Sequence, residues 1–205
     1  MVPSSACSER WSPTASSYDT LQRAVGTGAL QAHIKATLEP IPAGCVVVDA
    51  GGGTGLSRDI WPADCDYVNL DSDPEKLAAF NRKGLRGRAV LGDITALDME
   101  PGSVDYVFIK AVAHHLDDVN LDSFLECSLR VLKPTGRLVF YDPVYLADRF
   151  LSRVLWRYDR GSFPRRAGVV LEILNRHFMP TRDEIVRGLF HTYLFYIGVP
   201  RAPAA

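Results

Sequence analysis

The chain has 205 residues, a length typical of one domain, and 47% of its residues are apolar. No run of about eighteen apolar residues predicts a membrane span, and the N-terminal residues lack the basic-then-apolar pattern of a signal peptide. The net charge of −1 argues against a general nucleic-acid binder. Four scattered cysteines show no spacing typical of a zinc site, so we expect reduced packing residues and a cytoplasmic protein.

The first part of the chain predicts a flexible lead-in and then a helix. Residues 1–16 are small and polar, whereas apolar residues recur with helical spacing over about 17–38. Short apolar runs then alternate with helical patterns. The expected strands are 45–48, 66–71, 88–91, 104–110 and 136–142, and the expected helices are 74–82 and 121–132. Two last β-rich segments, 181–187 and 191–199, are close enough in sequence to pair antiparallel.

This alternation predicts a single α/β domain over residues 1–205, with a mostly parallel sheet and helices on both faces. Ligands of such sheets bind beyond the carboxyl ends of the strands. The sequence places residues 49–55, Asp71, Asp93, residues 110–115 and Asp142 at those ends. The functional residues are therefore expected among them.

The first of these segments is a glycine loop, in which Asp49 precedes Gly51, Gly53 and Gly55. Glycine lets the main chain approach a ligand, and the loop offers N–H donors. The dinucleotide pattern G-x-G-x-x-G does not fit in any register, since Leu56, for example, stands where a third glycine is required. A nicotinamide oxidoreductase is therefore disfavoured. An acid before the loop suits a cationic ligand, such as an α-ammonium or a sulfonium, better than a pyrophosphate.

Two further acids follow the next two strands. Asp71 can accept hydrogen bonds from both hydroxyls of a ribose, and Asp93 can accept one from the exocyclic amine of adenine. Each acid also has a local interpretation. Asp49 could cap the loop, Asp71 could form an Asx turn before Pro74, and Asp93 could cap a helix. Together, three acids at successive strand ends fit adenosine attached to an amino acid.

Over about residues 40–145 the chain resembles the class I S-adenosylmethionine-dependent methyltransferases. VVVDAGGGTG is similar to the first motif of that family, VNLDSDPEKL to its ribose-binding strand end, and LGDI to its adenine-binding segment. VDYVFIKAVAHHLDD and VLKPTGRLVFYD resemble its fourth and fifth strands. The resemblance implies a Rossmann-like, seven-stranded sheet of order 3-2-1-4-5-7-6 with strand 7 antiparallel. It also implies S-adenosylmethionine (SAM) as the cofactor.

The same resemblance implies a set of cofactor-binding residues. Asp49 and the glycine backbone would hold the methionyl part, Asp71 the ribose, and Asp93 with the Ile94 N–H the adenine. The full set is Asp49, Gly51, Gly53, Gly55, Asp71, Ser72, Asp93, Ile94 and Lys110. Lys110 stands where the family often has a small polar residue. It could also repel the sulfonium, bind an anionic group of the substrate, or extend to solvent.

Methyl transfer requires alignment of the nucleophile and sometimes its deprotonation, but no metal. His114 and His115 follow the fourth strand, and either could be the general base. His115 is slightly favoured, and one of the two could serve only to orient the loop. Asp142, which leaves the fifth strand, is a candidate for contact with the substrate.

The segment after the fifth strand is strongly basic. Residues 149–187 carry nine arginines and four acids, whereas residues 1–148 carry 13 basic and 20 acidic side chains. Residues 145–163 are expected to form a helical cap, with arginines along one face of 145–160. That face could be solvated, could lie on a membrane surface, or could grip an anionic substrate group through Arg149 and Arg153. Residues 158–166 resemble a DRG-x-x-x-R turn found after strand five in some small bacterial methyltransferases.

Two functions of different classes follow. The leading one is methyl transfer from SAM to a small-molecule acceptor at an O, N or C atom that the sequence does not identify. The alternative is a relative that binds SAM or S-adenosylhomocysteine (SAH) as a binding or regulatory subunit without methylating anything.

Overall fold

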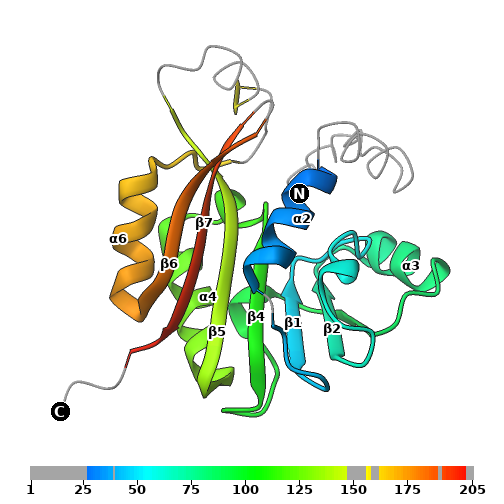
Figure 1. Cartoon of the computed structure of the whole chain (residues 1–205). Coiled ribbons are helices and arrows are strands. Elements are labelled where there is room, and N and C mark those ends of the chain that lie inside the picture. Colours follow the sequence, from blue (N-terminus) through cyan, green and yellow to red (C-terminus); the bar gives the residue numbers. More distant parts are fainter. Residues whose placement is uncertain (1–26, 39, 147–155, 158–161, 189–190, 202–205) are drawn as a thin grey trace, which may run out of the picture.

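The computed structural model describes residues 27–38, 40–146, 156–157, 162–188 and 191–201 (Figure 1). They form one seven-stranded sheet of order β3-β2-β1-β4-β5-β7-β6. The strands are β1 Val46–Ala50, β2 Asp66–Asp71, β3 Arg88–Leu91, β4 Val104–Lys110, β5 Leu132–Val144, β6 Phe178–Arg187 and β7 Thr192–Pro200. β7 runs antiparallel to β5 and β6, and all other neighbours are parallel. The expected fold and strand order are confirmed.

Four α-helices and three short 3-10 turns connect the described strands. The helices are α2 Thr27–Leu38, α3 Pro74–Arg82, α4 Asp118–Val131 and α6 Ala167–His177, and the turns are η1 Arg58–Ile60, η2 Ile94–Ala96 and η3 Ala113–His115. α4 begins earlier than the apolar pattern predicts, because the Asp117 side chain accepts the Asn120 N–H at 2.8 Å and caps the helix.

α6 is not among the helices expected from the sequence. Its buried residues, Val170, Ile173 and Leu174, recur with helical spacing inside the arginine-rich stretch. The three residues pack into the same core cluster as α4. The apolar spacing of these residues is thus the sequence signal for α6.

The sheet is covered on both faces, as expected. β4 shows this most clearly, because Val107 and Ile109 pack in the cluster that contains α4 and α6, whereas Tyr106 and Phe108 pack in the cluster that contains α2 and η1. Alternation of side chains along a strand sends neighbouring residues to opposite faces. The sheet therefore forms a rigid middle layer whose strand ends hold the site.

One expectation about the cysteines is wrong. Cys45 and Cys65, which directly precede β1 and β2, form a disulfide with their Cα atoms 4.8 Å apart. The Asp66 N–H also donates to the Cys45 carbonyl at 2.9 Å, so the two strand starts are side by side. Cys127 is not disulfide-bonded. Scattered spacing gave no sign of this pair, because the parallel sheet brings together residues twenty positions apart.

Some expectations fall on residues that the structure does not describe. These are the lead-in 1–16 and most of the cap 145–163, including Arg149 and Arg153. Within the described residues, no helix is both long and apolar enough to cross a membrane.

Candidate cofactor and catalytic site

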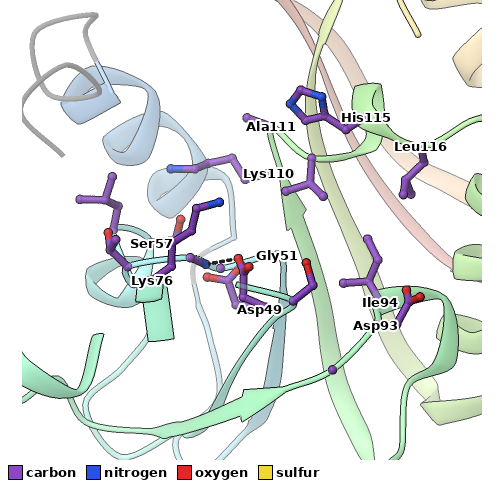
Figure 2. A pocket seen from close by; sticks show the side chains of 18 residues that line it. Asp49, Gly51, Ser57, Lys76, Asp93, Ile94, Lys110, Ala111, His115 and Leu116 are labelled. Atoms are coloured by element: carbon purple, nitrogen blue, oxygen red, sulfur yellow. Dashed lines mark hydrogen bonds between the residues drawn. The ribbon is translucent and has the colours of Figure 1, made fainter. Parts of the chain in front are cut away.

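A pocket of about 470 Å³ opens at the carboxyl ends of β1, β2 and β4 (Figure 2). This volume lies within the range of small-molecule sites. Eight of the nine expected cofactor residues line it, namely Asp49, Gly51, Gly53, Asp71, Ser72, Asp93, Ile94 and Lys110. Parallel strands explain this gathering, because their carboxyl ends meet at one edge of the sheet.

Asp71 and Asp93 both accept hydrogen bonds from nearby residues and also line the pocket. Asp71 Oδ1 accepts the Asp73 N–H at 2.9 Å, which is the Asx turn, while its Oδ2 accepts the Gly53 N–H at 2.9 Å. Asp93 caps η2 by accepting from the Thr95 N–H and hydroxyl, both at 2.8 Å. A carboxylate has about four acceptor positions, so both acids retain capacity for a ligand.

Asp49 is an unusual acid, because it is only 2% exposed. Burial raises the pKa of its carboxyl to about 6, although the hydrogen bond from the Tyr67 hydroxyl and the charge of Lys110 act in the opposite direction. Burial likewise lowers the pKa of the Lys110 ammonium. A buried acid and a partly buried base therefore line the same pocket. This donor set fits the ammonium and carboxylate of an amino-acid tail.

The Asp49 carboxyl makes the stability of the chain depend on pH. Its pKa is about 6 in the folded state and near the ordinary 3.8 in the unfolded state, so between these values the folded chain holds a proton that the unfolded chain releases. The contribution of Asp49 to stability is therefore greatest at low pH and falls as the pH rises through 6. A difference of about 2 pKa units corresponds to about 3 kcal/mol.

Asp49→Asn removes this titration. Between pH 4.5 and 7.5, the free energy of unfolding of the wild type should fall by about 2 kcal/mol relative to the variant, as measured by urea denaturation. Asp64→Asn, which changes an exposed carboxyl, is the control. Parallel pH profiles for wild type and Asp49→Asn would contradict the raised pKa.

Two glycines of the loop, Gly51 and Gly55, are required by the packing of the protein itself. Gly51 has φ +76°, and a Cβ there would lie 2.6 Å from Val112 Cγ2. Gly55 does not line the pocket, contrary to expectation: a Cβ there would overlap the Phe80 ring and lie 2.8 Å from Leu85 Cδ1. Gly55 is thus a packing residue between the loop and α3.

The two histidines lie in the histidine loop (residues 111–116) and take different positions. His115 lines the pocket, whereas His114 is 8% exposed and its Nδ1 lies 3.0 Å from Asp142 Oδ2. Asp142 Oδ1 also accepts the N–H groups of Val112 and Ala113 at 2.9 and 3.1 Å. The structure therefore does not bring Asp142 to the pocket as a substrate contact. The Asp142 side chain instead holds the histidine loop from the sheet side.

Three residues of the site were missed from the sequence. Tyr67 donates to Asp49, Asn69 Nδ2 donates to the Gly53 carbonyl at 2.8 Å, and Lys76 of α3 lines the pocket. Tyr67 and Asn69 alternate with Asp71 along β2, so all three side chains point to one face. Polar residues at every second position of an otherwise buried strand were the available signal.

Comparison with known proteins gives matches along most of this chain. Residues 48–140 match the family model described as "Methyltransferase domain". An uncharacterized methyltransferase of Mycobacterium sp. (strain KMS) is 32% identical over 123 residues, which cover 58% of this chain and 48% of that protein. The chain thus spans about half the length of the first curated relatives that it matches.

Two solved structures show the same fold. Magnesium protoporphyrin IX methyltransferase of Synechocystis PCC 6803, solved with bound SAH, has a TM-score of 0.73 at 14% identity, over 92% of this chain and 96% of that one. The second is a chain from the complex of the Haloferax volcanii Trm112 methyltransferase activator with a methyltransferase. It has a TM-score of 0.74 at 18% identity, over 94% of this chain and 100% of that one. The strand order is the one that the resemblance implies, and residues 48–140 match a methyltransferase family model.

Proposed function

Starting from a methyltransferase domain with this pocket, we propose that the protein transfers a methyl group from SAM to a small-molecule acceptor. One observation carries the proposal. Asp49, Asp71 and Asp93, which lie at or just beyond the carboxyl ends of three different strands, line a single pocket. Their order along it suits the amino-acid tail, the ribose and the adenine of one ligand.

Each part of SAM has residues that suit it. Asp49 would bind the α-ammonium and Lys110 the α-carboxylate, because opposite charges in a buried site attract strongly. Asp71 and Ser72 would hold the ribose, and Asp93 with the Ile94 N–H would hold the adenine. SAM bound in this way supplies an electrophilic methyl group.

His115 would accept the proton of an acceptor hydroxyl or amine at a ring nitrogen. Its place on the pocket wall supports this role, and a histidine titrates near neutral pH. Once an acceptor is identified, His115→Ala should lower kcat by roughly 100-fold or more while SAH affinity changes little. Full activity of this variant would remove His115 from the mechanism.

The small-molecule acceptor is supported by a row of rings that begins at His114, whose ring centroid lies 4.0 Å from that of the pocket-lining His115. The rings of His114, Trp156, His191 and Tyr193 follow one another with centroids 5.6, 5.4 and 6.4 Å apart, and Tyr141 stacks on Tyr193 at 5.0 Å. The Tyr141 hydroxyl and the Trp156 indole N–H are buried without a hydrogen-bond partner in the described structure. A flat organic molecule with a polar group would suit these side chains.

Calorimetric titration of the purified protein with SAM, SAH and NAD tests the function. We expect micromolar binding of SAM and SAH and no binding of NAD. Binding of NAD alone would overturn the proposal. If SAM binds but no member of a broad acceptor panel is methylated, the non-methylating alternative gains support.

A further inference from the structure

The histidine loop contains a backbone conformation that its surroundings must hold. Ala111 has φ +55°, a left-handed conformation that side-chain-bearing residues rarely adopt. Such a residue persists where neighbouring contacts over-determine it. Its own N–H donates to the Tyr141 carbonyl at 2.8 Å, which ties the start of the loop to β5.

On the sheet side, Asp142 accepts the N–H groups of Val112 and Ala113, as described above. A strap, residues 162–166, binds the carbonyl groups of the loop. The Phe163 N–H donates to the His114 carbonyl at 2.6 Å. The loop is therefore held through its donors by β5 and through its acceptors by the strap.

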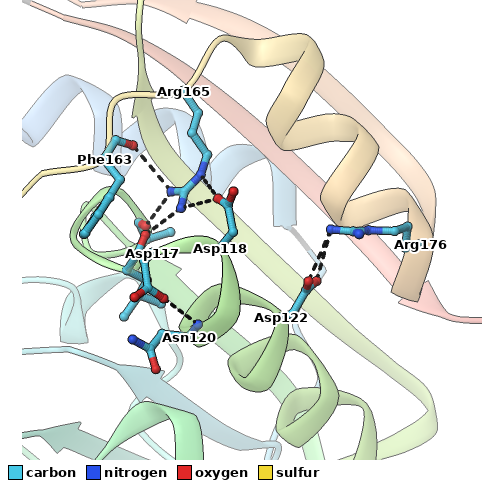
Figure 3. Close-up of polar contacts among 9 residues, drawn as sticks. Asp117, Asp118, Asn120, Asp122, Phe163, Arg165 and Arg176 are labelled. Atoms are coloured by element: carbon cyan, nitrogen blue, oxygen red, sulfur yellow. Dashed lines mark hydrogen bonds and ion pairs between the residues drawn. The ribbon is translucent and has the colours of Figure 1, made fainter.

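Arg165 makes most of the strap's polar contacts (Figure 3). Its Nη1 donates to the Ala113 carbonyl at 3.3 Å and its Nη2 to the Leu116 carbonyl at 2.7 Å. These two carbonyls flank the histidine pair. Nε and Nη2 also contact Asp118 Oδ1 at 2.9 and 2.8 Å, at the first turn of α4.

The guanidinium is enclosed as well as bonded. The Arg165 side chain is 10% exposed, and its backbone carbonyl accepts the Tyr145 N–H at 2.8 Å. A planar guanidinium with five donors can satisfy two carbonyls and a carboxylate at once, which a lysine ammonium cannot do in the same geometry. The arrangement therefore requires arginine at this position.

We propose that Arg165 is a positioning residue, which holds the histidine loop in the conformation that places His115 on the pocket wall. This gives a role to the last arginine of the DRG-x-x-x-R turn. The catalytic consequence rests on the proposed methyl transfer, but the placement of the loop does not.

Arg176 provides a matched comparison on the same face of the molecule. It also pairs with an acid of α4, since its Nη2 lies 3.2 Å from Asp122 Oδ1, but its side chain is 56% exposed. Within the described residues, the hydrogen bonds of its guanidinium go to Asp122. Arg176→Met thus removes an arginine–aspartate pair of α4 and leaves the loop contacts in place.

The test compares Arg165→Met, Arg165→Lys, Asp118→Asn and Arg176→Met with the wild type, without an acceptor. Hydrogen exchange would be measured on peptides covering residues 111–117, and the imidazole tautomers of His114 and His115 by nitrogen-15 NMR. In Arg165→Met we expect exchange at these amides to become roughly 10-fold faster and the imidazole nitrogen signals of His114 and His115 to shift. Arg165→Lys should recover part of the protection.

Asp118→Asn should have a smaller effect than Arg165→Met, because both carbonyl bonds remain. Arg176→Met should leave the loop exchange and the imidazole signals unchanged. Wild-type exchange and tautomers in a folded Arg165→Met protein would overturn the proposal. So would faster exchange spread evenly over all of α4 and the sheet, since that indicates general destabilisation.

SAH titration of the same proteins tests the proposed function separately. Failure of the wild type to bind SAH would count against the proposed function and leave the exchange result for the loop interpretable.

Discussion

Asp71→Ala is expected to weaken SAH binding about 30- to 100-fold, which is about 2–3 kcal/mol, the scale of two charge-assisted hydrogen bonds. The carboxylate lies at the end of β2 and lines the pocket beside Gly53. If it also binds both ribose hydroxyls, its removal costs the ligand two acceptors at once. Isothermal titration calorimetry at pH 7.5 would measure the change.

The control must account for the local role of Asp71, which accepts backbone N–H groups of Gly53 and Asp73. Asp73→Ala removes the neighbouring cap of α3, where the Asp73 side chain accepts from Glu75 and Lys76 N–H groups. It should cost about 1 kcal/mol of stability but leave SAH affinity within about twofold. Equal loss of affinity in both variants would indicate a disturbed loop and not a ribose contact.

Methylthioadenosine, which lacks the amino-acid tail, separates the two ends of the pocket. Asp71→Ala should weaken this ligand as much as it weakens SAH. Unchanged affinity of a folded Asp71→Ala protein for both ligands would remove Asp71 from the ribose site.

Gly55→Ala is expected to lower the free energy of unfolding by about 2–4 kcal/mol. Two costs add in this variant. Gly55 has φ +78°, which costs a side-chain-bearing residue about 1 kcal/mol, and the added Cβ would overlap Phe80, a ring with no exposed surface. Urea denaturation of the wild type and the variant gives the difference.

Gly44→Ala separates these two costs. Gly44 has φ +67°, but a Cβ there would meet nothing within 4 Å, so its substitution carries only the backbone cost. We expect a loss of about 1 kcal/mol for Gly44→Ala. If Gly55→Ala is no worse than Gly44→Ala, Gly55 is not tightly packed against α3, and a direct role in the pocket becomes the better explanation.

Most of the fold and of the pocket could be predicted from local sequence patterns and from the positions where strands end. The runs 66–71, 88–91 and 104–110 became β2, β3 and β4 with those bounds, because short apolar runs between turn residues favour strands. The acids after β1, β2 and β3 then had to meet, since parallel strands end at the same edge. The family resemblance supplied the antiparallel last strand, which the register of β5 with β7 confirms.

The sequence by itself therefore determined the α/β sheet, the position of the pocket and the acids that line it. Only the tertiary structure decided which histidine faces the pocket, that Asp142 holds the loop instead of a substrate, and that Gly55 packs against Phe80. It also joined Cys45 to Cys65 and brought Arg165 to carbonyl groups about fifty residues earlier in the chain. Helices and strands follow from local side-chain patterns. These contacts depend instead on register and packing between distant segments, which a local pattern does not determine.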